Sequence, residues 1–262
     1  MFAQTLPLTT PSGPFIILSR VDSSNNYAMA KLHEGLLVSG TSLLALEQTS
    51  GKGQRGRKWI SAPAENITIS FVYSLPHSFS ADAQNKIQRF PFLLSSCIAL
   101  SCYDFIKALG VPDIKIKWPN DLYIRDRKAG GILIENLFRG SDWMWTVAGV
   151  GINLNQQHFP GMENRATSIG IATGLHYDTV AEAKKLGDAV HARMQWLEHA
   201  AAAEILQEFN SQLYRKNEEV RLRKENAVFS TTIQHVDLEG KLHTADVIDR
   251  VFAVGDAEFV NE

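Results

Sequence analysis

Hydrophobic and polar residues alternate over short runs in the first 160 residues of the chain, and longer stretches with helical spacing lie between and after them. Alternation with a period of two is typical of strands that bury one face, whereas apolar residues three and four apart indicate a helix. The predicted strands are 15–18, 43–46, 67–73, 114–118, 122–124, 132–134 and 145–155. The predicted helices are 27–32, 90–109, 180–197 and 200–214.

After residue 217 the pattern changes to short alternating runs separated by polar turns. The runs are 220–222, 228–233, 241–243 and 251–254. Short strands joined by such turns predict a small β-barrel. We therefore expect a larger domain over residues 1–217 and a small β-domain over 218–262.

Composition narrows the classes of protein that this chain can belong to. A chain of 262 residues with 45% hydrophobic and 21% charged residues is typical of a soluble protein with one large and one small domain. No apolar run reaches the roughly 18 residues of a membrane-spanning helix, and residues 1–7 lack the features of a signal peptide. We therefore expect a cytoplasmic protein that does not bind membranes.

Charge and cysteine content exclude two further classes. The net charge of −2 provides no general attraction to nucleic acid, so polyanion binding is confined to local patches. Cys97 and Cys102 are the two cysteines, and both fall in the predicted helix 90–109 at a spacing that points them to different faces. Free thiols are expected, rather than a disulfide framework or a zinc site.

Residues 50–59, between two predicted strands, form the most unusual stretch of the chain. They combine Gly51, Gly53 and Gly56 with four cations and Trp59. Glycine lets a backbone approach an anion closely, and Lys and Arg supply the opposite charge. The stretch therefore predicts a binding loop for a phosphate or a carboxylate.

Neither standard phosphate-binding motif fits this stretch. Gly51 and Gly56 have the spacing of a P-loop, but Arg57 and Lys58 follow where that motif has Lys and then Ser or Thr. The Gly-x-Gly-x-x-Gly spacing of a dinucleotide site is also present, yet no helical pattern follows it. A basic surface loop or a nucleic-acid contact would explain the charges as well, but neither explains Trp59.

Four further polar motifs each have an ordinary structural explanation. Asp22–Asn25 contains residue types that cap helices. The Lys-Trp-Pro-Asn-Asp sequence at 117–121 ends a strand with a tight turn, and 149–155 is a buried strand whose glycines admit a close neighbour. Lys128 lies in a polar turn before the strand 132–134, where spacing alone indicates a surface lysine.

Taken together with residues 50–59, these motifs resemble those of the bacterial biotin protein ligases in order and rough spacing, over most of the chain. The resemblance is to the short form without an N-terminal DNA-binding domain, because 14 residues precede Phe15. It implies an α+β fold, a mixed sheet with helices resembling class II aminoacyl-tRNA synthetases, followed by a small SH3-like β-barrel. The catalytic domain that binds biotin and ATP would then be 1–217, and the SH3-like domain 218–262.

The resemblance also implies roles for individual residues. The implied catalytic residues are Lys128, Arg55 and Lys52. The implied biotin-binding residues are Ser23, Ser24, Asn25, Gln48, Lys52, Gly53, Gln54 and Lys128. The implied ATP- and adenylate-binding residues are Arg55, Arg57, Trp59, Lys117, Asn120, Asp121 and Asn153. The metal ligands stay open, and Gln54 stands where some members of the family carry an arginine.

The implied activity is a two-step, ATP-dependent ligation assisted by Mg²⁺. Biotin is activated as biotinyl-5'-AMP and then transferred to a specific lysine of a biotin carboxyl carrier protein, by a monomer or a homodimer. The alternatives are a lipoate or octanoyl ligase of the same superfamily and, in a different class, a nucleic-acid-binding regulator. The glycine stretch and the Lys-Trp-Pro-Asn-Asp sequence favour biotin, and the few residues before Phe15 argue against a DNA-binding helix-turn-helix.

Overall fold

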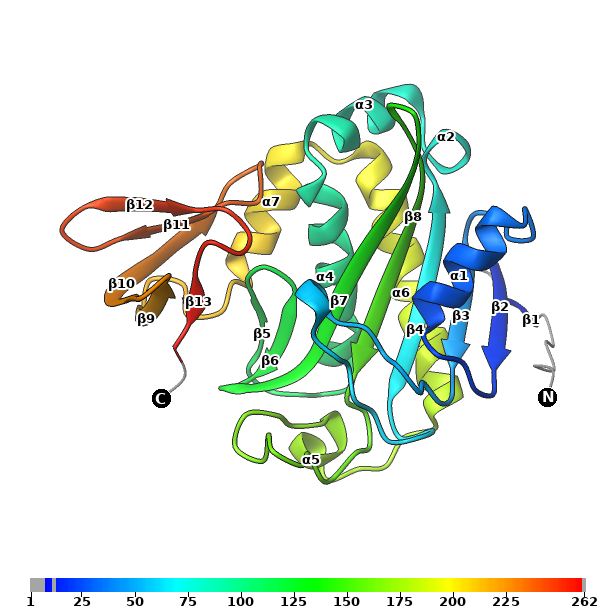
Figure 1. The fold of residues 1–262 in the computed structure, drawn as a ribbon, viewed down its shortest axis with the longest axis horizontal. Helices are drawn as coiled ribbons and strands as arrows, with labels where there is room; N and C mark the ends of the chain where they lie inside the picture. The colour runs from blue at the N-terminus through cyan, green and yellow to red at the C-terminus, as the bar shows by residue number, and fades with distance from the viewer. Residues whose placement is uncertain (1–7, 11–12, 261–262) are drawn as a thin grey trace.

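The computed structural model describes residues 8–10 and 13–260, which form a large mixed sheet, its helices and a second, smaller sheet (Figure 1). The strand order of the large sheet is β1-β2-β3-β4-β8-β7-β6-β5. Strands β2 and β3 pair in parallel, and the other neighbours pair antiparallel. The strands are β1 (Leu8–Thr10), β2 (Gly13–Leu18), β3 (Thr41–Ala45), β4 (Ile67–Ser74), β5 (Ile114–Lys117), β6 (Asp121–Ile124), β7 (Arg127–Arg139) and β8 (Asp142–Ile152).

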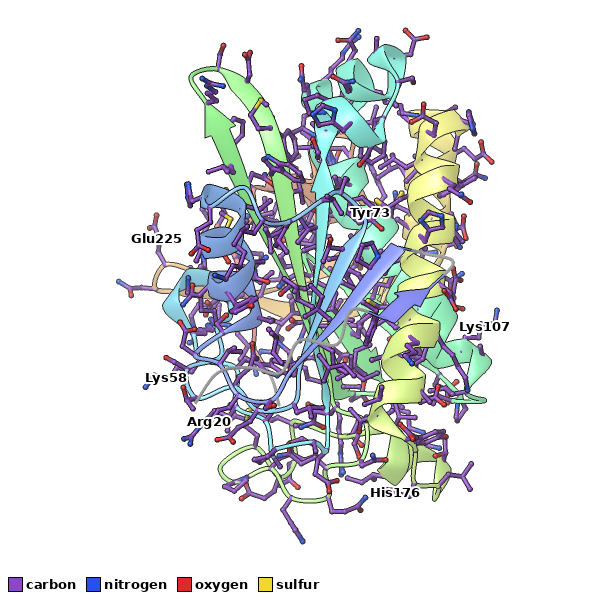
Figure 2. The ribbon with its side chains drawn as sticks, turned by 90° about the vertical axis from the view of Figure 1, so that its right-hand side faces the viewer. Arg20, Lys58, Tyr73, Lys107, His176 and Glu225 are labelled. Carbon is purple, nitrogen blue, oxygen red and sulfur yellow. The ribbon has the colours of Figure 1, made fainter. Side chains whose placement is uncertain are left out.

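Helices cover both faces of this sheet. Figure 2 shows α1 on one face and α6 on the other, where α4 and α7 also pack. No single described helix is long and apolar enough to span a membrane, although α3 and α4, bent by 97°, pass that test as a pair. The helices are α1 (Ser24–His33), α2 (Leu75–Ser78), α3 (Ala81–Arg89), α4 (Phe92–Ala108), α5 (Ile169–Thr173), α6 (Thr179–His199) and α7 (Ala202–Ser211), with one 3₁₀ turn, η1 (Gln54–Gly56).

The alternation along β4 places its residues in two environments. Ile67, Ile69 and Phe71 are buried in the main core with α4 and α6. Successive side chains of a strand point to opposite faces, so Thr68 and Ser70 lie on the α1 face. Burying a large apolar side chain stabilises the fold by about 2 kcal/mol. The sheet therefore has one apolar face that holds the core and one face that presents hydroxyl groups.

The second sheet is antiparallel and has the strand order β12-β11-β10-β9-β13. It lies beside the β5–β6 edge of the large sheet, far from β1 (Figure 1). The predicted α+β fold, a mixed sheet followed by a small β-structure, is confirmed, whereas the domain boundary after residue 217 stays a prediction. Its strands are β9 (Glu219–Lys224), β10 (Ala227–Val236), β11 (Leu242–Ala245), β12 (Asp249–Phe252) and β13 (Glu258–Phe259).

Some predicted element bounds were wrong, and hydrogen bonds to distant segments explain why. The strand predicted at 145–155 ends at Ile152: the Asn153 amide still donates to Ala129 of β7 at 2.8 Å, but the Asn153 carbonyl accepts from the Ile169 amide at 3.0 Å. Lys128 belongs to β7 rather than to a turn, since this strand pairs with both β6 and β8. The sequence did not predict β1, β13 or the short helices α2, α3 and α5, and much of residues 1–14 lies outside the described residues.

Candidate active site

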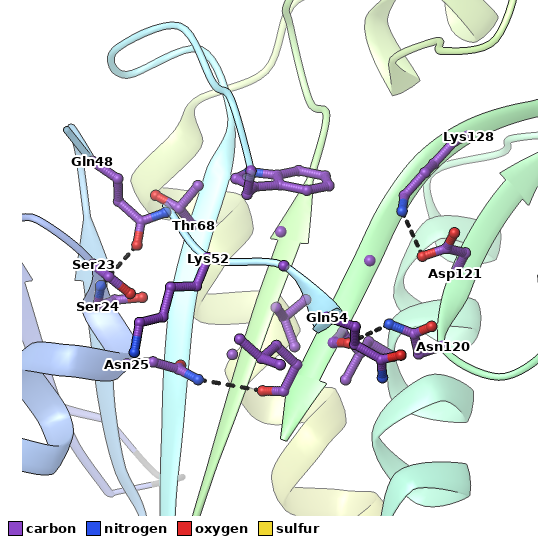
Figure 3. Close-up of a pocket in the computed structure, with 18 residues that line it drawn as sticks. Ser23, Ser24, Asn25, Gln48, Lys52, Gln54, Thr68, Asn120, Asp121 and Lys128 are labelled. Atoms are coloured by element: carbon purple, nitrogen blue, oxygen red, sulfur yellow. Dashed lines mark hydrogen bonds and ion pairs between the residues drawn. The ribbon is translucent and has the colours of Figure 1, made fainter. Parts of the chain in front are cut away.

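A cavity of about 60 Å³, here the serine cavity, lies between the start of α1 and the hydroxyl-bearing face of the sheet (Figure 3). The Ser24 amide donates to the Gln48 Oε1 atom at 2.7 Å. The Ser70 hydroxyl lies 2.7 Å from the Ser24 hydroxyl and donates to Asn25 Oδ1 at 2.6 Å. The structure thus brings together Ser23, Ser24, Asn25 and Gln48, as the sequence predicted.

The start of α1 is more than a helix cap. Ser23 occupies the N-cap position, but its side chain makes no capping hydrogen bond, and Ser24 and Asn25 lie in the first turn. All three residues are buried, at 2%, 4% and 3% exposure. Because buried polar side chains are costly unless paired, the hydrogen bonds from Ser70 to Ser24 and Asn25 stabilise this cluster. The sequence analysis missed Thr68 and Ser70, which the alternation along β4 could have revealed.

Two glycines of β8 make room for this side of the cavity. A Cβ atom on Gly149 would lie 2.4 Å from Asn25 Oδ1, and one on Gly151 would lie 2.5 Å from the Trp59 ring. Both distances are far below ordinary van der Waals contact. The close neighbours predicted for the glycines of 149–155 are therefore Asn25 and Trp59.

Lys128 and Asp121 form an ion pair at the opposite end of the serine cavity, with Lys128 Nζ 2.6 Å from Asp121 Oδ1 (Figure 3). A register shift between β6 and β7 places the two residues side by side. Gly131 contributes to this arrangement because any side chain there would crowd both partners. The lysine that spacing alone assigned to the surface is thus partly buried, with 27% of its side chain exposed.

The backbone of Lys128 is fixed by the loop that follows β8. Its amide donates to the Arg165 carbonyl at 2.8 Å, and its carbonyl accepts from the Thr167 amide at 2.9 Å. Asn153 Nδ2 donates to the Thr167 carbonyl at 2.9 Å, and Asn153 is only 4% exposed. Asn153 therefore holds the loop against Lys128, in addition to lining a cavity itself.

A larger cavity of about 600 Å³, here the arginine cavity, lies on the other side of Lys128. It contains Arg55, Arg57 and Arg165 together with aromatic side chains, and it shares Trp59, Asn120, Asp121 and Lys128 with the serine cavity. The sequence analysis missed its lining from the loop after β8 and from the second sheet. The missed residues include Phe159, Met162, Arg165, Gly255, Glu258 and Phe259.

Lys117 lies in the wall of the arginine cavity and is 8% exposed. Its Nζ atom is 4.4 Å from the ring centroids of both Tyr123 and Phe259, and it donates to the Tyr123 hydroxyl at 3.1 Å. Burial lowers the pKa of Lys117 to about 8, although Asp121 opposes this shift. Near neutral pH this lysine is therefore a cation held mainly by aromatic faces.

The glycine stretch is closed by its own backbone hydrogen bonds. The Gly53 amide donates to the Arg57 carbonyl at 2.7 Å, and the Trp59 amide donates to the Gly51 carbonyl at 2.9 Å. Trp59 Nε1 is buried and has no hydrogen-bond partner among the described residues. A bound molecule with an acceptor oxygen would satisfy this donor.

Three predicted cations of this stretch have acidic partners. Arg57 Nη2 lies 2.6 Å from Glu258 Oε1 of β13, and Arg55 Nη1 lies 3.9 Å from the same oxygen. Lys52 Nζ lies 3.6 Å from Glu135 Oε1 of β7, and the other Glu135 oxygen accepts from Asn25 Nδ2 at 2.7 Å. Of the predicted catalytic residues, Lys128 lies between the two cavities, whereas Lys52 lines the serine cavity and Arg55 the arginine cavity.

Comparison with known proteins places this architecture in a family. The model of the biotin/lipoate A/B protein ligase family matches residues 17–153, which is just over half of the chain. The chain belongs to this family. The match contains every predicted site residue, from Ser23 to Asn153.

Curated members of the family align with roughly half of this chain. The bifunctional ligase/repressor BirA of Escherichia coli is 34% identical over 142 residues, covering 54% of this chain and 41% of that protein. The biotin–[acetyl-CoA-carboxylase] ligase of Paracoccus denitrificans is 37% identical over 140 residues, 53% of each protein. The aligned segment thus spans about half of these relatives' own length.

Solved structures extend the likeness to the second sheet. The biotin protein ligase from Aquifex aeolicus in complex with biotin and ATP is 25% identical, with a TM-score of 0.73. The comparison covers 95% of this chain and 99% of that one. The mixed sheet with its C-terminal antiparallel sheet is thus the biotin protein ligase architecture.

Proposed function

We propose that this protein is an ATP-dependent ligase that activates biotin as biotinyl-5'-AMP and transfers it to a lysine of a biotin carboxyl carrier protein. The observation that carries the proposal is the position of the Lys128–Asp121 pair, which lines both the serine cavity and the arginine cavity. A carboxylate from one cavity and a phosphate from the other would meet beside the Lys128 ammonium group. Family membership supports the same reaction class.

The serine cavity fits the ureido ring and the short acyl chain of biotin. Its end near α1 carries the hydroxyls of Ser23 and Ser24 and the amides of Asn25 and Gln48, which can both donate and accept hydrogen bonds. Ile132 and neighbouring apolar residues supply the rest of the wall. The polar groups at this end would fix the orientation of such a ligand.

The arginine cavity fits ATP. Its arginines offer charge-assisted hydrogen bonds to phosphates, and Trp59, Tyr123 and Phe259 offer flat apolar surfaces to a base. The unpaired Trp59 Nε1 donor lies where the two cavities meet. An oxygen of the adenylate would satisfy it.

In the first step a biotin carboxylate oxygen bonds to the α-phosphorus of ATP while the bond to the β-phosphate oxygen breaks, and pyrophosphate leaves. The Lys128 ammonium reduces the repulsion between the two anions as they approach. Among the described residues, no cluster of three or more His, Cys, Asp or Glu side chains could hold a metal ion. Mg²⁺ that is bound mainly through phosphates requires only one or two carboxylates from the protein, and Asp121 could supply one. The ion would stabilise the negative charge on the leaving pyrophosphate.

The alternative substrate within the family is lipoate or octanoate. The hydroxyl and amide groups around Ser24 favour biotin, because they can form hydrogen bonds with its ureido ring and none with an aliphatic chain. The decisive experiment is pyrophosphate exchange with purified protein, comparing biotin with lipoate. Biotin-dependent exchange is expected, and exchange with lipoate alone would overturn the proposal.

The acceptor and the other partners follow from the same proposal. We infer a carboxyl carrier protein as acceptor, no nucleic-acid partner, a cytoplasmic location and either a monomer or a homodimer. The net charge of −2 supports the absence of nucleic-acid binding. Sequence-specific DNA binding in a gel-shift titration at physiological salt would contradict this part alone.

A further inference from the structure

A third cavity of about 280 Å³, here the Phe92 cavity, opens between the start of α4, strand β7 and the second sheet. Gln54 and Asn120 line all three cavities, so these two residues mark a junction. Ile132 lines both the serine cavity and the Phe92 cavity. Core packing accounts for the helical pattern at 90–109, but the first turns of α4 also line this cavity.

In the second step of the proposed reaction, an amine must reach the acyl carbon of the adenylate. If the acyl chain occupies the serine cavity and AMP occupies the arginine cavity, the acyl carbon lies at their junction. The amine that attacks this carbon needs a path that neither group fills. The Phe92 cavity opens onto the same junction at Gln54 and Asn120.

The charges of the two open cavities also differ. The arginine cavity contains several cations, which would repel a lysine ammonium group. The Phe92 cavity contains no cation, and its one charged residue is Glu239. Glu239 makes no hydrogen bond or ion pair with any described residue and is exposed. Its carboxylate is therefore free to attract an incoming ammonium group.

Glu239 is held at the rim of the cavity by the next residue in the chain. Trp118 Nε1 donates to the Gly240 carbonyl at 2.9 Å, and Trp118 is only 4% exposed. Gly240 has a φ of +79° and lies so close to the Phe92 ring that a Cβ atom would approach it to 2.7 Å. The turn of the second sheet that carries Glu239 is thus anchored to both α4 and the end of β5.

We propose that the Phe92 cavity is the path by which the acceptor lysine reaches the acyl adenylate, with Glu239 attracting its ammonium group at the rim. This inference rests on the proposed function. The amine nitrogen bonds to the acyl carbon, the bond from that carbon to the phosphate oxygen breaks, and AMP leaves with the electron pair. Two protons of the original ammonium group are released to solvent. The apolar walls of Phe92, Ile134 and Trp143 contact the methylene groups of the lysine.

The test uses Ser95→Trp, which fills the cavity from a half-buried position on α4. Biotin-dependent pyrophosphate exchange should stay within about twofold of wild type. Transfer from the preformed adenylate to a purified biotin carboxyl carrier domain should fall by about a hundredfold, as expected for a displaced reactant. The control is Ser211→Trp, an exposed helical serine on α7 that lines none of the three cavities, and it should change neither rate.

A second variant keeps the test informative if Ser95→Trp is poorly folded. Glu239→Lys reverses the charge at the rim and should slow transfer by about tenfold at low salt, with the difference shrinking as ionic strength rises. Transfer to hydroxylamine, a small neutral nucleophile, should be unaffected. Unchanged transfer to the carrier domain, or equal losses in exchange and transfer, would overturn the inference. Absence of biotin-dependent exchange in the wild-type protein would instead overturn the proposed function.

Discussion

The serine cavity and the arginine cavity share a wall but are built differently. The serine cavity is formed by α1 and the sheet, and its polar side chains are buried and bonded to one another. The arginine cavity is formed largely by loops and by β13, and two of its arginines are exposed, at 51% for the Arg55 side chain and 71% for that of Arg57. One cavity is therefore preorganised for a neutral, hydrogen-bonding ring, while the other presents exposed positive charge.

The difference shows how one fold can bind two unlike substrates. A neutral ligand gains from donors and acceptors that are already in place, because little ordering is needed on binding. A polyanion gains from cations that can approach it from several sides. In this structure the Glu258 carboxylate forms ion pairs with Arg55 and Arg57. We expect ATP phosphates to displace the Glu258 carboxylate and to draw the glycine stretch over the adenylate.

The largest expected effect comes from Lys128→Ala, which removes the cation shared by both cavities. Losing one such electrostatic contact costs about 3 kcal/mol, or about a hundredfold in rate. Biotin-dependent pyrophosphate exchange should fall by that factor, while transfer from supplied biotinyl-adenylate suffers much less, since the carboxylate charge is gone. Lys224→Ala, on exposed β9, is the control. Equal losses in both steps would contradict the assignment of Lys128.

A change confined to the serine cavity should separate the two substrates. A Cβ atom on Gly149 would displace Asn25, because the two would lie 2.4 Å apart. For Gly149→Ala we expect the KM for biotin to rise about tenfold, as for the loss of one or two buried hydrogen bonds, with the KM for ATP nearly unchanged. Ser70→Ala, which removes a hydroxyl and adds no atom, should act in the same direction but less. A parallel rise in both KM values would show that the cavities are not independent.

Lys117→Met tests the arginine cavity through stability. The burial that lowers the pKa of Lys117 from 10.5 to about 8 disfavours its charged form by about 3 kcal/mol, and lost cation–π contacts offset part of this. At pH 7 the variant should therefore be more stable than wild type by about 1 to 2 kcal/mol. Its KM for ATP should rise, because a cation has been removed from the cavity.

The lowered pKa of Lys117 also predicts how the stability difference between wild type and Lys117→Met changes with pH. Below pH 8 the wild-type lysine is charged in both states, so the full cost of burying the charge is present. Between about pH 8 and 10.5 the unfolded chain binds more protons than the folded one, and wild-type stability rises relative to Lys117→Met. Urea unfolding at pH 7 and pH 9.5 measures both differences, and a constant gap would refute the lowered pKa.

The smallest effect is expected from Glu258→Gln, which frees Arg55 and Arg57. Exposed ion pairs contribute at most about 1 kcal/mol, so global stability should hardly change. The KM for ATP should fall by about two- to threefold, because the phosphates no longer compete with a carboxylate. Limited trypsin digestion should cut the glycine stretch faster in the variant than in wild type. Saturating biotin plus MgATP should protect the stretch in both proteins, and equal cutting with and without ligands would count against loop ordering.

Much of the fold and the outline of the site follow from local patterns in the sequence. The alternation in β4 and the helical spacing in α4 predicted which residues face the main core, because the direction of a side chain depends on a repeat that is local in the chain. The motifs around Ser24, Trp59, Asp121 and Lys128 named most of the residues that line the serine cavity. Helix and strand ends were less well predicted where distant segments supply the hydrogen bonds, as at Asn153.

Contacts between residues far apart in the chain depend on how whole elements pack together. Glu258 contacts Arg57 from 201 positions away, Gly240 accepts from Trp118 across 122 positions, and Glu135 reaches Asn25 across 110. Arg57, Trp118 and Asn25 belong to motifs that mark them in the sequence, but their partners Glu258, Gly240 and Glu135 do not. The contacts of Glu258 and Gly240 depend on how the second sheet packs beside α4 and β5. The contact of Glu135 depends on the position of β7 relative to the start of α1. Long-range packing of this kind is set by the summed burial of many side chains, so no local stretch of sequence encodes it.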